Sequence, residues 1–198
     1  MTLPLFPLKT VLFPGGLLPL RVFEQRYIEM TKRCLKDDAP FGVCLLTRGE
    51  EVAGRAKNTG LPEFASIGTL ARIVGWDMPQ LGILHVKAEG TTRFHVHSHR
   101  VADDGLVVAE TTALAPEPAT ALAEEYEPLA ALLELMMNRV GQEHFIGERT
   151  IGDASWVGYR LVELLPLPLS IKQNMLEINA PEVRLKVLKE VLKQQDLL

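Results

Sequence analysis

The pattern of hydrophobic and polar positions changes once along the chain, near residue 116. Before that point, short apolar runs are broken by proline and glycine, which predicts strands and turns. After it, apolar residues recur every three or four positions, which predicts helices. Two prolines in Ala115-Pro116-Glu117-Pro118 interrupt both patterns. We therefore expect two domains, residues 1–116 and 117–198.

One stretch of the first part has the period of a helix. Between Glu24 and Lys36, apolar side chains recur at three and four residues and charged ones fill the other face, which predicts one amphipathic helix inserted among strands. The apolar positions are Tyr27, Ile28, Thr31, Cys34 and Leu35. Strands are expected at Leu3–Leu8, Gly16–Phe23, Phe41–Thr47, Ala65–Trp76 and Leu106–Leu114, with a long loop over Arg48–Pro62.

A hairpin is predicted around Glu89-Gly90-Thr91. If these residues form the turn, Val86 faces Phe94 and His85 faces His95, so that one face of the pair is apolar throughout. A slip of one residue would mix the two faces. The first part then holds about six strands and one helix, enough for a small closed or nearly closed barrel.

The second part predicts four helices, at Ala119–Val140, Ser155–Leu164, Ser170–Glu177 and Glu182–Gln194. Ser170 with Gln173, and Asn179 with Glu182, have the spacing of capping boxes. In the last helix we expect an apolar stripe of Val183, Val187, Leu188, Val191 and Leu192, and a polar face of Arg184, Lys186, Lys189 and Lys193.

Composition and charge narrow the function classes. The chain has 198 residues, of which 47% are hydrophobic, as in ordinary core-forming proteins. Residues 1–116 carry 13 Lys and Arg against 12 Asp and Glu, and residues 117–198 carry 8 against 13. Neither part has the basic excess that several phosphate contacts need, which argues against nucleic acid as a partner.

The amino-terminal residues are apolar but do not form a signal peptide, because they lack a basic start and contain Pro4, Pro7, Pro14 and Pro19. No segment offers 18 uninterrupted apolar residues, so no membrane partner is expected. We expect a cytoplasmic protein in which Cys34 and Cys44 are reduced residues of the core.

The histidines are the main candidates for metal binding. His95, His97 and His99 alternate along one predicted strand, with neighbouring imidazoles about 7 Å apart, and His85 faces His95 in the predicted hairpin. Lys87 and Arg93 share that face and oppose a cation. A solvated strand face is therefore the favoured interpretation, with His85, His95 and His97 as weak metal candidates.

Sequence motifs for catalysis are lacking. The chain has four serines, none of them within Gly-x-Ser-x-Gly, and neither cysteine has a neighbour that would activate a thiolate. Paired carboxylates, such as Asp37-Asp38 and Asp103-Asp104, fall at predicted turns, where solvated charge is usual. We therefore expect a protein that is not an enzyme and needs no cofactor.

The residues that distinguish the chain lie mostly near its start. They are Leu5-Phe6-Pro7-Leu8, Val11-Leu12-Phe13-Pro14-Gly15-Gly16, Leu18 to Glu24, Arg26-Tyr27, Phe41-Gly42-Val43, Ile67 to Ile73, Gly90 to Phe94, and near the end Val162 to Leu167 and Lys172-Gln173. In this order they resemble the amino-terminal substrate-binding domain of the Lon protease family, in particular its stand-alone bacterial form. The Phe-Pro-Gly and Pro-Leu-Arg elements are weak one by one but specific together.

The resemblance implies an α+β protein, with a PUA-like β pseudo-barrel carrying one inserted helix followed by a helical bundle. It further implies a recognition role without the ATPase and peptidase of the full protease. The expected partners are unfolded or tagged polypeptides or a partner protein. Peptide contacts are expected beside the inserted helix, at Phe13, Leu20, Phe23, Arg26 and Tyr27, where apolar anchors lie near a charge.

Two alternatives remain open from the sequence. One is an enzyme or a small-molecule- or metal-binding protein that uses the His85/His95/His97 face or a pocket. The other is RNA binding, which PUA-like folds can support despite the flat charge balance.

Overall fold

The computed structural model describes residues 1–49, 62–141 and 145–194, and the chain divides into two compact units, Met1–Ala115 and Pro116–Leu198. We call them the β unit and the helical unit. Most of the loop predicted at Arg48–Pro62 lies outside the described residues. Among the described helices, none has the length and apolarity to cross a membrane.

The β unit is a ring of strands with additions on two of its members. β1 pairs with β7 in antiparallel fashion and with β3 in parallel fashion, which closes the ring β1-β7-β6-β5-β3. β2 pairs with β6, and the short β4 pairs with β3. The strands are β1 (Thr2–Leu8), β2 (Leu17–Val22), β3 (Phe41–Arg48), β4 (Glu63–Phe64), β5 (Ile67–Gln80), β6 (Ile83–Val101) and β7 (Val107–Ala113). The first six residues of β3 are all buried, as its unbroken apolar run predicts.

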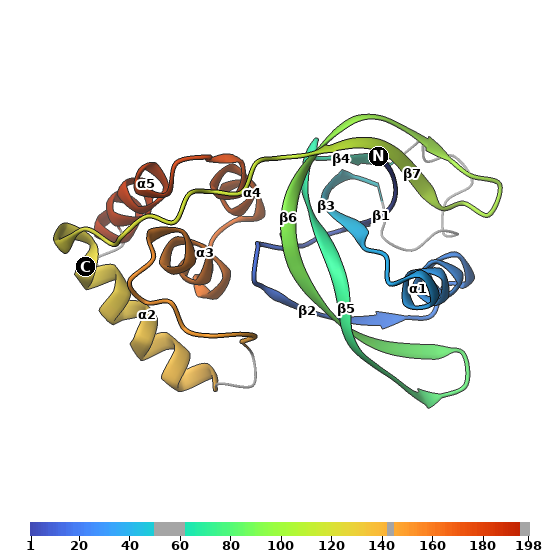
Figure 1. Cartoon of the computed structure of the whole chain (residues 1–198), viewed down its shortest axis with the longest axis horizontal. Helices are drawn as coiled ribbons and strands as arrows, with labels where there is room; N and C mark the ends of the chain where they lie inside the picture. Colours follow the sequence, from blue (N-terminus) through green and yellow to red (C-terminus); the bar gives the residue numbers. More distant parts are fainter. Residues whose placement is uncertain (50–61, 142–144, 195–198) are drawn as a thin grey trace. The chain divides into compact units, whose positions relative to one another are not determined.

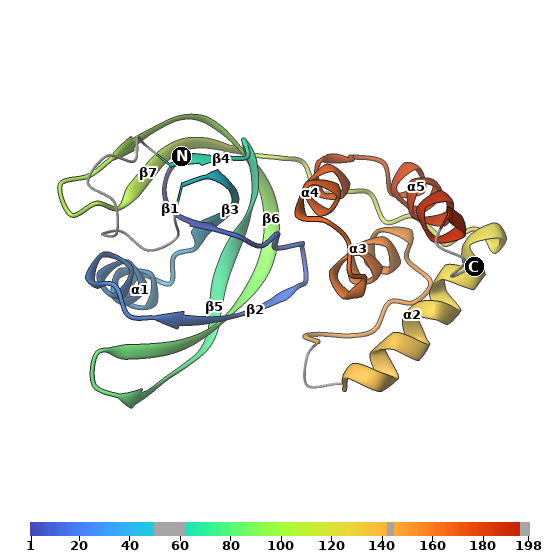
Figure 2. The ribbon, with the colours of Figure 1, turned by 180° about the vertical axis from the view of Figure 1, so that it is seen from behind.

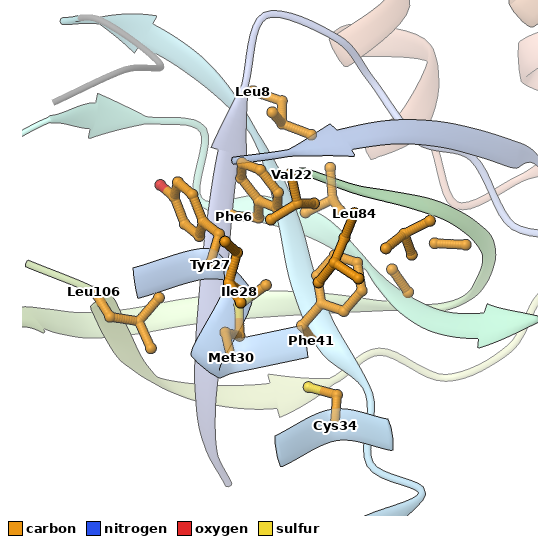
Figure 3. Packing of buried hydrophobic residues seen from close by; sticks show 14 of the residues in the cluster. Phe6, Leu8, Val22, Tyr27, Ile28, Met30, Cys34, Phe41, Leu84 and Leu106 are labelled. Carbon is orange, nitrogen blue, oxygen red and sulfur yellow. The ribbon is translucent and has the colours of Figure 1, made fainter. Parts of the chain in front are cut away.

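The inserted helix α1 (Gln25–Asp37) lies close to its predicted position. Its buried face packs into the larger of the two apolar clusters of the β unit, where the Tyr27 ring stacks on Phe6 at 3.8 Å between centroids (Figures 1 and 3). Met30 is buried and Leu35 partly exposed, so the apolar face is centred slightly differently from the prediction. The second cluster gathers around the fully buried Phe94.

The predicted position of the hairpin turn is wrong. Residues 83–101 form one continuous strand, β6, and the chain reverses earlier, at Leu81-Gly82, where Gly82 has a φ of +83°. Gln80 therefore pairs with Ile83, and His85 pairs with Asp77 of β5 instead of His95. The chain does not turn at Gly90 because the two β-branched threonines that follow favour an extended strand, and a single glycine is not enough to form a turn.

Gly90 has another role, since it allows a close backbone crossing. A Cβ atom there would lie 2.2 Å from the carbonyl oxygen of Phe13. The Gly90 N–H donates to Gly16 O at 2.8 Å, and Gly15 N–H donates to Gly90 O at 2.7 Å. The Pro-Gly-Gly segment of the sequence motif is thus held against the middle of β6.

The helical unit contains α2 (Glu127–Val140), α3 (Ala154–Leu164), α4 (Leu169–Glu177) and α5 (Pro181–Gln194), with the 3-10 turn η1 (Glu124–Tyr126) before α2 (Figure 2). Asp153 caps α3 by accepting from Trp156 N–H at 2.7 Å. Residues 119–123, predicted as helix, instead pair with residues 150–154 through Leu122 N–H to Gly152 O and Ala154 N–H to Thr120 O. Helix α2 can begin at Glu127 because Pro128 occupies its first turn, where its missing N–H costs nothing.

The capping box predicted at Ser170 does not form, although α4 and α5 each begin within one residue of the predicted start. Pro168 is the N-cap of α4, so Ser170 already lies in the first turn, and the Gln173 amide donates to Glu177 instead of reaching back. Helix α5 begins at Pro181, two residues after Asn179. Pro168 is the residue before α4 and has an extended backbone, whereas Pro181 is the first residue of α5, where its fixed φ suits the first turn.

The buried face of α5 also differs from the prediction. Arg184 is fully buried together with Leu185, Leu188 and Leu192, whereas Val183 and Val187 are exposed. A prediction from periodicity assigns every arginine to the solvent face, so it placed the apolar stripe of α5 too far round the helix. The polar partners that make burial of Arg184 possible come from elsewhere in the helical unit.

Candidate functional site

An open groove of about 690 Å³ lies along β2 and the adjoining ends of β5 and β6. Leu20 on β2 is registered opposite Val86 on β6, and Val86 opposite Trp76 on β5, so these three form an apolar row across the strands. We call this the β2 groove. It is lined by Pro19, Leu20, Arg21, Gly75, Trp76, Asp77, His85, Val86 and Lys87.

A smaller hollow of about 190 Å³ adjoins the start of α1. It shares Pro19, Leu20 and Arg21 with the β2 groove, so β2 contributes to both depressions. The remaining lining residues are Phe6, Leu8, Val22, Phe23, Glu24 and Tyr27. Apolar side chains with a few charges at their rim are the usual lining of a recognition surface.

The five residues predicted to contact peptide have different surroundings. Phe13 and Tyr27 are buried in the core, and the Tyr27 ring also receives the Arg26 guanidinium at 4.5 Å from its centroid. Arg26 is held by Glu24 at 3.0 Å and by the carbonyl of Gly105 at 2.8 Å. Phe23 is 52% exposed, and Leu20 is half-buried in both depressions. The structure therefore brings Leu20 and Phe23 to the surface and uses Phe13 and Tyr27 for packing.

Sequence reasoning missed the apolar surface of the β5–β6 hairpin. Trp76 is 56% exposed and Leu81, in the turn, is 93% exposed, with Val74 and Met78 exposed nearby. The available signal was the alternation of Val74, Trp76 and Met78, which puts three large apolar side chains at strand spacing. Placing the turn at residues 89–91 hid this signal, because it ended the preceding strand at Trp76.

The comparisons with known proteins identify the family. A sequence profile described as the ATP-dependent protease La (LON) substrate-binding domain matches residues 2–194. The chain belongs to this family. The crystal structure of a Lon N-terminal domain protein from Xanthomonas campestris is 37% identical, covers 96% of this chain and 98% of that chain, and superimposes with a TM-score of 0.78.

Lon proteases match this chain over only a small part of their own length. Lon protease 2 of Myxococcus xanthus is 41% identical over 73 residues, which are 36% of this chain and 8% of that protein. The Lon protease of Cytophaga hutchinsonii is 26% identical over 188 residues, which are 89% of this chain and 22% of that protein. The chain thus spans less than a quarter of the length of each of these two curated relatives.

The histidine face of this Lon-family chain is not assembled as the sequence suggested. His85 and His95 lie on the same strand ten residues apart, which is about 33 Å measured along the strand. His95 and His97 have ring centroids 4.9 Å apart, but His97 Nε2 is bonded to Thr112 Oγ1 at 2.8 Å, and His99 packs on Phe64. Across the described ranges, no three His, Cys, Asp or Glu side chains gather in a metal-binding arrangement. The prediction that His85 could join His95 is wrong, because the turn between them does not exist.

Both cysteines are buried free thiols, as predicted. Burial raises the pKa of Cys44 to about 12 and also raises that of Cys34, where Arg33 opposes the effect. Neither thiol is therefore a nucleophile near neutral pH.

The most strongly polar cluster of this Lon-family chain lies inside the helical unit. Glu117 accepts hydrogen bonds from Arg184, Ser155 and Tyr159. Burial on its own would raise the pKa of Glu117, but these three donors and the Arg184 charge outweigh it and lower the pKa below the usual range. The cluster fixes a carboxylate in place and leaves no proton to exchange near neutral pH, which is the behaviour of a structural ion pair.

A second carboxyl, Glu163, behaves in the opposite way. It accepts from Arg160 at 2.9 Å, yet burial raises its pKa to about 7 against the opposing charges of Arg160 and Lys172. Between the ordinary pKa of 4.5 and about 7, the folded unit binds more protons than the unfolded chain. Its stability should therefore fall as pH rises through this window, by roughly 1–3 kcal/mol.

Urea unfolding of a Trp76→Phe background at pH 5.0 and 7.5 measures this pH dependence, because Trp156 then reports the helical unit alone. We expect the free energy of unfolding to be larger at the lower pH. In Glu163→Gln, which cannot titrate, most of the difference should disappear. An equal difference in both proteins would show that another group is responsible.

Proposed function

We propose that this chain is a non-catalytic polypeptide-binding module, whose β unit is a PUA-like pseudo-barrel and whose helical unit is a bundle. The open apolar β2 groove carries the proposal, since it presents Leu20 and Trp76 to solvent beside Phe23. Exposed apolar anchors within a polar rim suit segments that are apolar and unfolded. The family supports the same function, because its members are described as substrate-binding domains.

The rim of the groove favours one kind of segment. Arg21 and Lys87 are permanent positive charges in its lining, against the single carboxylate of Asp77. Apolar residues followed by an acidic one would therefore match the groove better than apolar residues followed by a basic one. The free side of β2, which pairs with no strand in the described part of the chain, offers backbone groups to an extended segment.

The chain's chemistry supports recognition in place of catalysis. Its buried thiols are protonated, and its strongest carboxylate cluster, around Glu117, is an internal ion pair. We accordingly propose unfolded or tagged polypeptides, or a partner protein exposing such a segment, as ligands, and the cytoplasm, where free thiols persist, as the location.

Fluorescence anisotropy with a labelled, reduced and carboxymethylated polypeptide tests the groove. We expect saturable binding, weakened about tenfold by Leu20→Ser and by Phe23→Ser, because each removes roughly 1.4 kcal/mol of apolar contact. Leu81→Ser is the matched control: this side chain is exposed on the same unit but lines neither depression, so binding should not change.

Two results would contradict the proposal. One is the absence of saturable binding by the wild-type chain. The other is an equal loss in all three variants, which would place binding elsewhere on the apolar surface. The same polypeptide in its native, disulfide-bonded form should bind at least tenfold more weakly, because its apolar segments are buried.

A further inference from the structure

The outer half of β5 has a free edge. β3 pairs with β5 only through Thr69, Leu70 and Ala71, whereas β6 continues to pair along the opposite side as far as Gln80. From Arg72 onward, no strand of the described ranges pairs with the second side of β5. An exposed edge of this length is a template for another strand. The edge ends at Pro79, which has no N–H to offer.

The side chains along this edge form a pattern that reads the same in both directions. Arg72 and Asp77 are registered opposite Glu89 and His85, which lie on the solvent face of β6. Ile73 and Trp76 are registered opposite Ala88 and Val86, which lie on the buried face. Alternation along β6 therefore places the two charged residues on one face of β5 and the two apolar residues on the other.

A bulge makes the pattern symmetrical. The register shifts between Ile73 and Gly75, so Val74 is the extra residue, and it is 42% exposed. Gly75 is registered opposite Lys87 on the solvent face. The registered residues 72, 75 and 77 thus lie on the solvent face, and residues 73 and 76 lie on the inner face.

We propose that two copies of this chain associate by antiparallel pairing of their β5 edges about a two-fold axis between Val74 and Gly75. In this register Arg72 of each copy lies opposite Asp77 of the other, which forms two ion pairs on one face. Ile73 of each copy lies opposite Trp76 of the other, which forms two apolar contacts on the other face. A shift of one residue would place Arg72 opposite Trp76 or Met78 and would mix the faces, so the register is specified by charge and by apolarity together.

Ile73 is half-buried against the core of its own chain, and the two charged residues, Arg72 and Asp77, keep only surface contacts. Arg72 pairs with Glu89 at 3.1 Å on the surface, and an exposed pair of this kind is weak enough to be shared with a second carboxylate. Asp77 is exposed and accepts a local hydrogen bond from Met78 N–H at 2.8 Å. The edge is short, so we expect a reversible dimer with a dissociation constant in the micromolar range, about 1–100 μM.

Sedimentation velocity of the full chain over about 1–200 μM, at low salt, tests this interface. We expect a monomer–dimer equilibrium. Arg72→Asp and Asp77→Arg should each weaken dimerisation at least tenfold, because each places like charges opposite one another twice. The double variant Arg72→Asp/Asp77→Arg restores opposite charges and should return the dissociation constant to within about threefold of wild type.

Matched controls separate the edge from general charge effects. Lys36→Asp and Asp103→Arg make the same kinds of charge change on the β unit away from β5, and both should leave dimerisation unchanged. A wild-type chain that stays monomeric throughout, or single variants that dimerise as well as wild type, would overturn the proposal. So would a double variant no better than the single ones. Trp76 and Asp77 also line the β2 groove. Leu20→Ser and Phe23→Ser change neither residue and should not affect dimerisation, so this proposal and polypeptide binding can fail separately.

Disulfide trapping tests the register itself. Chains carrying R72C and chains carrying D77C, mixed and oxidised, should form a cross-linked dimer, because directly opposed residues have Cα atoms about 4.5–5.5 Å apart. Either chain alone should cross-link at least tenfold more slowly, because its two introduced cysteines would lie about 16 Å apart. The buried Cys34 and Cys44 make little background. Equal cross-linking in the mixed and separate samples would contradict the register.

Discussion

Replacing Arg184 with methionine should destabilise the helical unit by about 3–5 kcal/mol. Arg184 is fully buried, and its guanidinium satisfies four groups at once. Nε donates to Met175 O at 3.0 Å, Nη1 to Glu117 at 3.0 Å, and Nη2 to Ile178 O at 2.7 Å and to the Tyr159 hydroxyl at 3.0 Å. Methionine fills similar space but leaves Glu117 as a buried carboxylate without its cation.

The local structure is arranged around this side chain. Gly158, in the middle of α3, has no Cβ, and a Cβ there would lie 3.1 Å from Arg184 Cδ. The guanidinium also lies over the Tyr159 ring at 3.9 Å from its centroid. Because Glu117 directly follows the start of the unit at Pro116, the ion pair ties the first residues of the helical unit to α3 and α5.

Urea unfolding followed by Trp156 fluorescence in the Trp76→Phe background measures the effect. Lys189→Met is the matched control, because Lys189 lies on the same helix and pairs with Glu125 at 3.1 Å on the surface, where the expected loss is below about 1 kcal/mol. Adding Glu117→Gln to Arg184→Met removes the orphaned charge and should recover part of the loss. A loss in Arg184→Met no larger than in Lys189→Met would show that the ion pair does not hold the unit together.

Gly90→Ala should destabilise the β unit by more than about 3 kcal/mol. The added Cβ would lie 2.2 Å from the Phe13 carbonyl oxygen and about 3.0 Å from the Leu12 side chain, so the backbone crossing would have to open. Opening it would break the two hydrogen bonds that join Gly90 to Gly15 and Gly16. These contacts hold the Pro-Gly-Gly segment beside β6.

Gly75→Ala is the matched control in the same sheet. The only atom near its added Cβ is Lys87 Cβ at 4.0 Å, which is an ordinary contact. We expect no loss, or a gain of a few tenths of a kcal/mol, because alanine restricts the unfolded chain more than glycine. Thermal unfolding followed by circular dichroism compares the two variants. A similar unfolding temperature for Gly90→Ala and wild type would mean that the crossing adapts without cost.

Local patterns predicted the elements that depend on local interactions. The three- and four-residue spacing around Tyr27 predicted α1, and both ends of α3, α4 and α5 lie within one residue of their predicted positions. The unbroken apolar run at Phe41 predicted that β3 is buried. These features follow from residues less than a few turns apart, which periodicity samples directly.

The candidate site was predicted only in part. Leu20 and Phe23 follow from the motif at the start of the chain, and both reach the surface. Trp76 joins them only because β2 and β5 both pair with β6, a contact between residues more than fifty positions apart. Phe13 and Tyr27 are aromatic residues of the same motif as Phe23, so the sequence does not distinguish them. Only the packing of the fold decides that Phe13 and Tyr27 are interior residues.

By itself, the sequence determined the change from strands to helices near residue 116, most of the elements on either side, and the resemblance to the Lon family that the comparisons then established. Tertiary structure decided where β5 turns into β6, which apolar side chains stay exposed, and which face of α5 is buried. Arg184 shows the physical reason. A guanidinium can enter the interior when a carboxylate 67 positions away, two carbonyls and a tyrosine receive it, and no local pattern encodes such partners.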